Sequence, residues 1–202
     1  MTLIEFVEKY DFPGSVVLLE GKRVVYENDK QKLYEFGRGI ANATQHIKFR
    51  SGNAEGADLL FAKGVASVDK NRIEVITPYS GHRKSENVAG STIAIDTLPI
   101  SDLTNAIEIS SYNQAYRKMV DAYINDNENR SNQFSIKGAY ILRDSLKVVG
   151  SDSIISPSVF GFFYVHMHNP RSGGTGHTMN VCNLKKVPFL DQRKWSEWLK
   201  EM

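Results

Sequence analysis

The sequence predicts an α/β fold with three layers, in which helices cover both faces of a Rossmann-like, mostly parallel sheet. Short apolar runs typical of buried strands alternate along the chain with segments whose apolar residues recur at helical spacing. Two glycine-containing turns, at residues 50–58 and 171–178, each follow an apolar run and precede a helical pattern. Repeated strand–helix–strand units form parallel sheets through right-handed crossovers, which place helices on both faces.

The first half of the chain shows the clearest alternation. The β-branched and aliphatic run at residues 15–19 enters the turn Glu20-Gly21-Lys22-Arg23, and Pro78 ends a later run of the same kind. Between them, apolar residues follow the spacing of amphipathic helices. The elements expected here are, in order, a strand at 15–19, a helix at 29–44, a strand at 47–49, a helix from residue 57 and a strand at 73–77.

The second half begins with a polar segment and has a strong strand near its end. The nearly continuous apolar run at residues 159–167 indicates a central strand covered on both faces. We expect residues 1–202 to form a single domain whose middle segment, at about 80–135, is enlarged. The other elements expected are a loop at 80–105 with a short strand at 92–95, a helix at 112–124, an exposed connection at 126–133, a helix at 139–149, a helix ending at about residue 185, an edge strand at 187–190 and a terminal amphipathic helix.

Composition argues against several classes of protein. The chain has 25 Lys and Arg residues against 23 Asp and Glu residues, so no global field attracts nucleic acid or an anionic membrane, and nucleic-acid binding is disfavoured. The single cysteine, Cys182, excludes an intrachain disulfide, suits a reducing compartment and falls in a helix expected to be buried. The N-terminal residues lack the pattern of a signal peptide, and no apolar stretch approaches the ~20 residues that span a bilayer. We therefore expect a soluble cytoplasmic protein.

The two glycine-containing turns are the best candidates for a ligand site. Their sequences are Arg50-Ser51-Gly52-Asn53-Ala54-Glu55-Gly56-Ala57-Asp58 and Arg171-Ser172-Gly173-Gly174-Thr175-Gly176-His177-Thr178. Such turns place backbone N–H groups at a helix N-terminus, where they bind phosphate and other anions. Ligands of parallel sheets bind at the carboxyl ends of the strands, so we expect both turns to face one shared cleft. The alternative is that the glycines only provide the positive φ of a tight turn.

Charged residues in these turns have two readings each. Arg50 and Arg171 are expected either to bind phosphate oxygens or to be solvated charges at strand ends. Asp58 falls in the first turn of a helix, where the helix dipole favours a carboxylate, and we prefer this structural role to an interaction with ribose hydroxyls. Glu55 lies near the same helix terminus and is expected to be more exposed.

The turns resemble those of the SLOG superfamily, the Rossmann-like group that includes LOG phosphoribohydrolases, YpsA-related proteins and the DprA family. In that group the first strand ends in Gly-Ser-Arg, and the YpsA-like branch follows with Ser-Gly-Gly-Ala-x-Gly-Ala-Asp. Here Glu20-Gly21-Lys22-Arg23 keeps a glycine and a basic residue but lacks the serine, and Asn53 stands where the second glycine is usual. The turn at residues 172–178 is similar to the Gly-Gly-Thr turn of the superfamily, and residues 187–189 are similar to its last strand.

The resemblance implies a small-molecule ligand of the nucleotide type, in the class of ADP-ribose, NAD, AMP or cyclic nucleotides, which the protein senses or sequesters. Tyr79 begins a basic loop that either stacks a base or is simply exposed. The residues expected to bind the ligand are Gly21, Arg23, Arg50, Ser51, Gly52, Asn53, Glu55, Gly56, Asp58, Tyr79, Arg171, Ser172, Gly173, Gly174, Thr175, Gly176, His177 and Thr178.

The resemblance implies the binding site more than the LOG reaction. LOG enzymes have the pattern Gly-Gly-x-Gly-Thr-x-x-Glu, whose glutamate assists cleavage of an N-glycosidic bond, and this chain has Asn180 at that position. An amide cannot act as a general acid or base. The alternative function, a nucleotide N-glycosidase or another nucleotide-processing hydrolase, would therefore use Glu55, Asp58 or His177.

Two further groups of residues have less specific readings. His166 and His168 lie on one face of a strand end and, with His177, have the residue types of a metal site, but no acidic partner at ligand spacing accompanies them, so no metal is expected. Trp195 and Trp198 mark one helix face that packs on the sheet or on a second subunit, and stacking of a base is the lesser alternative. A homo-oligomer is expected.

Overall fold

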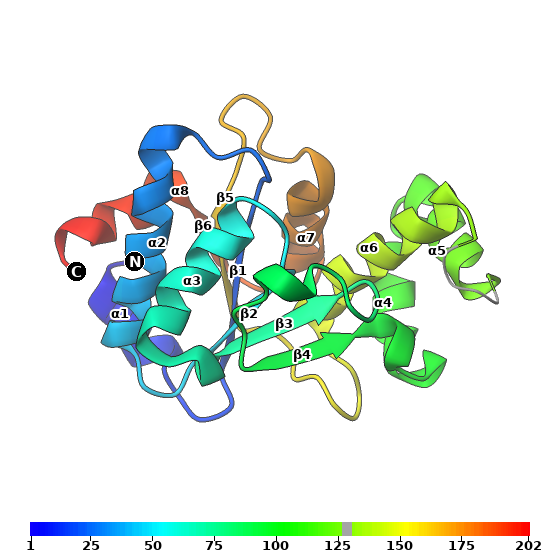
Figure 1. Cartoon of the computed structure of the whole chain (residues 1–202), viewed down its shortest axis with the longest axis horizontal. Coiled ribbons are helices and arrows are strands. Elements are labelled where there is room, and N and C mark those ends of the chain that lie inside the picture. Colours follow the sequence, from blue (N-terminus) through cyan, green and yellow to red (C-terminus); the bar gives the residue numbers. More distant parts are fainter. Residues whose placement is uncertain (127–130) are drawn as a thin grey trace.

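The computed structural model describes residues 1–126 and 131–202, and in this part of the chain it contains one sheet of six parallel strands (Figure 1). The strands lie in the order β4-β3-β2-β1-β5-β6. The fold is therefore the α/β, Rossmann-like arrangement that the sequence predicts. The strands are β1 (Val16–Gly21), β2 (Lys48–Ser51), β3 (Ile73–Thr77), β4 (Ser91–Ala94), β5 (Phe160–Tyr164) and β6 (Phe189–Asp191).

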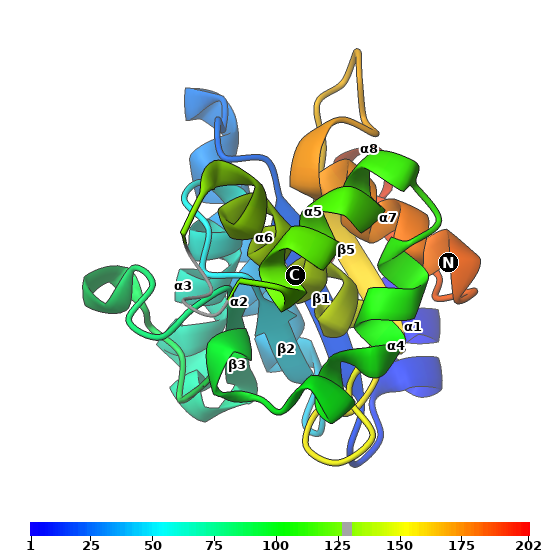
Figure 2. The same ribbon diagram turned by 90° about the vertical axis from the view of Figure 1, so that its right-hand side faces the viewer.

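Helices cover both faces of this sheet (Figures 1 and 2). One hydrophobic cluster joins one face of the sheet to α1, α2, α3 and α8, and two other clusters join the opposite face to α4, α5, α6 and α7. The helices are α1 (Leu3–Tyr10), α2 (Glu27–Ala43), α3 (Ala57–Asp69), α4 (Ile100–Ser110), α5 (Gln114–Ile124), α6 (Gln133–Val149), α7 (Gly173–Leu184) and α8 (Gln192–Trp195).

The alternation of side chains along β1 assigns each residue to a face. Val17 and Leu19 pack in the cluster with α2 and α3, whereas Leu18 packs in the cluster with α7. Successive side chains of a strand point to opposite faces. Glu20 therefore faces the side of α6 and α7, where it meets Lys147.

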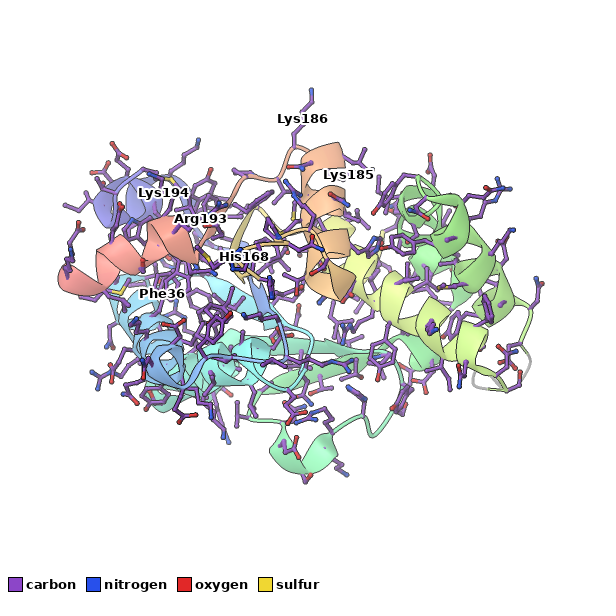
Figure 3. The ribbon with its side chains drawn as sticks, turned by 90° about the horizontal axis from the view of Figure 1, so that it is seen from above. Phe36, His168, Lys185, Lys186, Arg193 and Lys194 are labelled. Atoms are coloured by element: carbon purple, nitrogen blue, oxygen red, sulfur yellow. The ribbon has the colours of Figure 1, made fainter. Side chains whose placement is uncertain are left out.

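The aromatic residues near the C-terminus pack inside the chain. The Trp195 Nε1 donates a hydrogen bond of 2.9 Å to the Phe163 carbonyl, and its ring lies 4.5 Å from that of Phe36, which points into the layer of helices on this face (Figure 3). Trp198 is also buried, against Phe162. Both tryptophans thus pack on the sheet, as the first of the three readings predicts, and the expected homo-oligomer stays a prediction.

Residues 80–105 are less irregular than the sequence predicts. The short strand expected at 92–95 is present as β4, but α4 begins at Ile100 inside the expected loop. Leu103 and Ala106 of α4 bury against α6, and this long-range packing makes the helix stable although the local sequence is polar.

Other boundaries also differ from expectation. Helix α6 begins at Gln133 because the side chain of Asn132 caps it by accepting hydrogen bonds from two backbone N–H groups. The expected connection at 126–133 is thereby shorter, and its residues 127–130 lie outside the described residues. Strand β5 ends at Tyr164, before residue 167, and the expected terminal helix is α8 followed by a 3-10 helix at Ser196–Lys200.

The strand order creates a crevice at β1. The chain adds strands on one side of β1 up to β4 and then returns to place β5 on its other side. In an open parallel sheet, the crevice at such a reversal lies outside the carboxyl ends of the two strands and is the usual ligand site. No helix in the described ranges is long and apolar enough to cross a membrane.

Candidate functional site

A pocket of about 680 Å³ opens at this crevice, a volume in the range of small-molecule sites. Its wall contains Ala54 and Asp58 from the first glycine-containing turn and residues 172–175 from the second. The two turns thus share one pocket, as the sequence predicts. The remaining lining residues are Glu20, Gly21, Lys22, Arg23, Tyr116, Met119, Ile136, Lys137, Tyr140, Ile141, Arg143, Asp144, Lys147 and His177.

The second turn presents open backbone groups to the pocket. Ser172 is the N-cap of α7 but its side chain makes no capping hydrogen bond, and Gly173 and Gly174 are exposed. The first N–H groups of a helix have no intrahelical acceptor, so they remain free to bind an anion. Gly176 also serves the tight turn, because a Cβ there would lie 1.9 Å from the Arg171 carbonyl oxygen. Thr178 is buried and donates to the Gly174 carbonyl.

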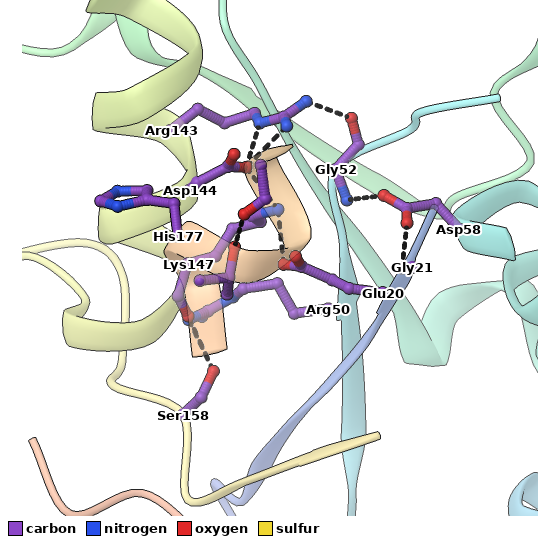
Figure 4. Close-up of polar contacts among 12 residues, drawn as sticks. Glu20, Gly21, Arg50, Gly52, Asp58, Arg143, Asp144, Lys147, Ser158 and His177 are labelled. Atoms are coloured by element: carbon purple, nitrogen blue, oxygen red, sulfur yellow. Dashed lines mark hydrogen bonds and ion pairs between the residues drawn. The ribbon is translucent and has the colours of Figure 1, made fainter. Parts of the chain in front are cut away.

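The first turn is closed by the protein itself. Asp58 accepts a hydrogen bond of 2.8 Å from the N–H of Gly21 and one of 3.2 Å from the N–H of Gly52 (Figure 4). The Gly52 carbonyl accepts from Arg143 at 3.0 Å. The carboxylate of Asp58 therefore occupies the position that a phosphate was expected to take. Gly56 is needed for the turn itself, with a φ of 85° and a Cβ position 2.0 Å from the Arg23 carbonyl oxygen.

Other expected ligand residues of the first turn have structural roles. Ser51 is fully buried, and the side-chain amide of Asn53 donates to the carbonyls of His82 and Arg83. Glu55 is exposed, 3.8 Å from Arg83, and lies outside the pocket wall.

The two arginines that precede the turns also lie outside the pocket wall. Arg50 is buried, where it donates to Glu74 at 2.6 Å and to the carbonyls of Lys147 and Ser156 at 2.8 Å. The reason is its position in β2, a central strand covered by helices, which leaves its guanidinium no route to solvent. Arg171 is exposed and lies over the ring of Phe189.

Four charged residues of the pocket wall, Glu20, Arg143, Asp144 and Lys147, form a buried network (Figure 4). The Lys147 Nζ lies 2.5 Å from Glu20 Oε1 and 2.8 Å from Asp144 Oδ1. The Arg143 Nη2 lies 2.6 Å from the same oxygen of Asp144. Sequence reasoning missed this network, although α6 carries charges at two positions four residues apart, 143 and 147, on a face expected to be buried.

The network shifts the pKa values of its members in different directions. Burial raises the pKa of Glu20 to about 7, assisted by the carboxylates of Asp144 and Asp58 and opposed by Lys147. Burial also acts to raise the pKa of Asp144, but Arg143 and Lys147 outweigh it and hold that pKa below its ordinary value. Burial also raises the pKa of Asp58, so Glu20 and Asp58 both hold a proton more tightly than ordinary carboxyl groups, Glu20 with a pKa of about 7.

The outer wall of the pocket combines apolar and basic groups. Tyr116, Met119 and Tyr140 of α5 and α6 form an aromatic and apolar surface, and Tyr140 contacts Tyr79, which lies outside the wall. The described wall carries five basic side chains against three acidic ones. By contrast, Lys185 and Lys186 lie at the far end of α7 and extend into solvent (Figure 3).

The histidines do not gather. His177 lines the pocket but is held by Ser145 Oγ, 2.9 Å from Nε2, and by Tyr112, and burial lowers its pKa so that the ring is neutral. His166 and His168 are exposed, with ring centroids 5.9 Å apart. Within residues 1–126 and 131–202, no group of three His, Cys, Asp or Glu residues is arranged to hold a metal ion.

No protein-family model, curated protein or solved structure matches this chain. The resemblance to the SLOG superfamily therefore stays a prediction.

Proposed function

We propose that this chain binds a nucleotide, or a closely related phosphate-bearing nucleoside, in the pocket at β1. The observation that carries the proposal is the convergence of three features on one volume: the open N-terminus of α7, an excess of basic side chains and an aromatic wall. Phosphate would bind at residues 172–175 through backbone N–H groups. The base would pack against Tyr116 and Tyr140, since an aromatic surface stacks any base.

Isothermal titration with ADP-ribose, NAD, AMP and cyclic AMP tests this proposal. The Tyr116→Ala variant should bind the best ligand of this panel about 1–3 kcal/mol more weakly, because it removes a stacking surface. Phe12→Ala is the matched control, since Phe12 is an exposed aromatic residue outside the pocket. Absence of binding at millimolar concentrations of the whole panel would contradict the proposal.

A second candidate function is hydrolysis of the N-glycosidic bond of the bound nucleotide, and Glu20 favours it. A carboxyl group whose pKa is about 7 is suited to protonate the leaving base at neutral pH. The bond between C1′ and the base nitrogen would break, and water would supply the oxygen of a new C1′–O bond and the proton that restores Glu20. Glu55 lies outside the pocket and Asp58 is bonded to two amides, so Glu20 replaces both as the acid.

Chromatographic detection of free adenine from AMP tests this second function. Glu20→Gln should abolish the release, whereas Glu55→Gln, the same change at an exposed glutamate, should leave it unchanged. If wild-type protein releases no base from any nucleotide of the panel, binding without turnover remains.

A further inference from the structure

The pocket wall contains three carboxylates, and their partners differ. Both oxygens of Asp58 accept hydrogen bonds from backbone N–H groups, those of Gly21 and Gly52. Oδ1 of Asp144 accepts from Arg143 and lies 2.8 Å from Lys147 Nζ. Asp58 cannot take a new partner without losing bonds that hold the site together, whereas Oδ2 of Asp144 lies against Gly174, at the α7 N-terminus where phosphate is proposed to bind.

Glu20 is different. Its side chain is 4% exposed, and Oε1 lies 2.5 Å from the Lys147 Nζ. Among the described residues no donor reaches the other oxygen, Oε2, and this oxygen, unlike Oε1, is not a fully buried atom, so it opens toward the pocket that Glu20 lines. A ligand that supplies an O–H group to this oxygen would gain a charge-assisted hydrogen bond when Glu20 is ionised.

A short series of contacts connects the carboxylate of Glu20 to the N-terminus of α7. A Cβ at Gly174 would lie 2.9 Å from Asp144 Oδ2, and the other oxygen of Asp144 lies 2.8 Å from Lys147, which contacts Glu20. A group bound at Glu20 is therefore close to, but separate from, a phosphate bound at α7. In a nucleotide, the sugar connects the phosphate to the base, and its hydroxyls are the donors at that position.

We propose that Glu20 accepts a hydrogen bond from the 2′,3′-diol of a bound ribose, so that the pocket selects ribonucleotides over deoxyribonucleotides. This inference rests on the proposed function. The sequence analysis considered an interaction of Asp58 with ribose hydroxyls, and this inference assigns that interaction to Glu20 instead. Glu20 would then be a specificity-determining residue.

Titration of AMP and ADP, each beside its 2′-deoxy and 3′-deoxy forms, tests the inference. Wild-type protein should bind at least one deoxy form about 10- to 100-fold more weakly than the ribonucleotide, as expected for loss of a hydrogen bond to a charged group. Binding of all forms within about threefold of one another would overturn the inference and leave the proposed function intact. Failure of AMP and ADP to bind also overturns it, and if the wider panel is silent too, the proposed function falls with it.

Two variants assign the selectivity to Glu20. Glu20→Gln replaces a charged acceptor by a neutral one and should lower the ratio of the two dissociation constants several-fold. Glu20→Asp keeps the charge but withdraws it from the pocket, and it should lower the ratio as well. Glu55→Gln is the matched control and should keep the wild-type ratio, because Glu55 is exposed outside the pocket.

The variants are compared only where circular dichroism shows a folded protein. An unchanged ratio in a folded Glu20 variant would overturn the assignment to Glu20. If neither variant folds, the wild-type ratio decides the inference by itself.

Discussion

At the scale of single residues, the pocket contains buried charge pairs whose members lie far apart in the sequence. The sequence predicts a structural role for Asp58, and the structure gives it two backbone amides as partners. It does not predict the pairing of Glu20 with Lys147, because these residues lie on different elements and each alone resembles an ordinary surface charge. Local patterns predict which apolar residues are buried, but they do not predict which charged residues are buried or which of these meet.

Lys147 is the cation shared by two buried carboxylates, so its removal should be costly. Lys147→Met leaves Glu20 beside Asp144 with no ammonium between them, and we expect the free energy of unfolding to fall by about 3–5 kcal/mol. Urea unfolding followed by circular dichroism measures this. Lys32→Met, which removes a cation from an exposed pair with Asp29, should change stability by less than about 0.5 kcal/mol. A loss below about 1 kcal/mol for Lys147→Met would contradict the importance of the network.

The raised pKa of Glu20 predicts how stability depends on pH. Its pKa is about 7 in the folded chain against an ordinary value of 4.5, so the folded state binds the proton more tightly. The stability that this group contributes is complete below pH 4.5 and is lost as the pH rises through 7. The charged groups that face Glu20, namely Lys147, Asp144 and Asp58, are the same in wild type and in the Glu20→Gln variant.

Glutamine resembles the protonated form of Glu20 at every pH. The free energy of unfolding of Glu20→Gln, relative to wild type, should therefore rise between about pH 5 and about pH 8. Urea unfolding of both proteins across this range gives the difference. A difference that stays constant with pH would show that Glu20 does not titrate there.

At the scale of elements, the strands and the glycine-containing turns were predictable, whereas the helices α1 and α4 were not. The strand at residues 73–77 has the predicted bounds, because its apolar run and Pro78 are local signals. Helix α4 was missed because its burial depends on α6, a partner that no local pattern reveals. The same limit explains the first turn, whose glycine pattern is real but whose anion position is filled by Asp58.

A carboxylate in the first turn of α7 should compete with a bound phosphate. Thr175→Glu should weaken nucleotide binding at least about tenfold, because the new charge repels the ligand at short range. It should leave the helix intact, since the helix dipole favours an acidic residue there. Ser101→Glu makes the same change in the first turn of α4, outside the pocket, and its affinity should match wild type in the same titration. Equal affinities of the two variants for the nucleotide would show that its phosphate does not bind at the N-terminus of α7.

At the scale of the whole molecule, the two faces of the sheet differ in composition, since one packs aromatic residues and the other contains buried charges. The face covered by α1, α2, α3 and α8 contains the aromatic cluster, and the face covered by α6 and α7 contains the buried charges. The sequence predicts the parallel sheet but not that β5 returns to the far side of β1, because strand order is a property of long-range pairing. The sequence therefore predicts that the two glycine-containing turns share a cleft, but not that this cleft lies at β1, between β2 and β5.

This division predicts that stability and binding separate by face. Trp198→Ala should lower the free energy of unfolding by about 3–5 kcal/mol, because Trp198 is buried against Phe6 and Phe162. The nucleotide affinity of the protein that remains folded should be unchanged. Ile4→Ala, at an exposed position of α1, is the control and should have little effect on unfolding. A parallel loss of affinity in Trp198→Ala would show that the two faces are coupled.

The pocket wall is assembled from three distant stretches of the chain, residues 20–58, 116–147 and 172–177. Any compound that fills it touches all three at once and must be released before they can separate. A bound ligand should therefore raise the free energy of unfolding, by about 2.7 kcal/mol when the free ligand concentration is a hundred times the dissociation constant. The melting temperature rises with it. A compound that raises the melting temperature in a screen of a chemical library can consequently be identified as a ligand, whatever its chemical class.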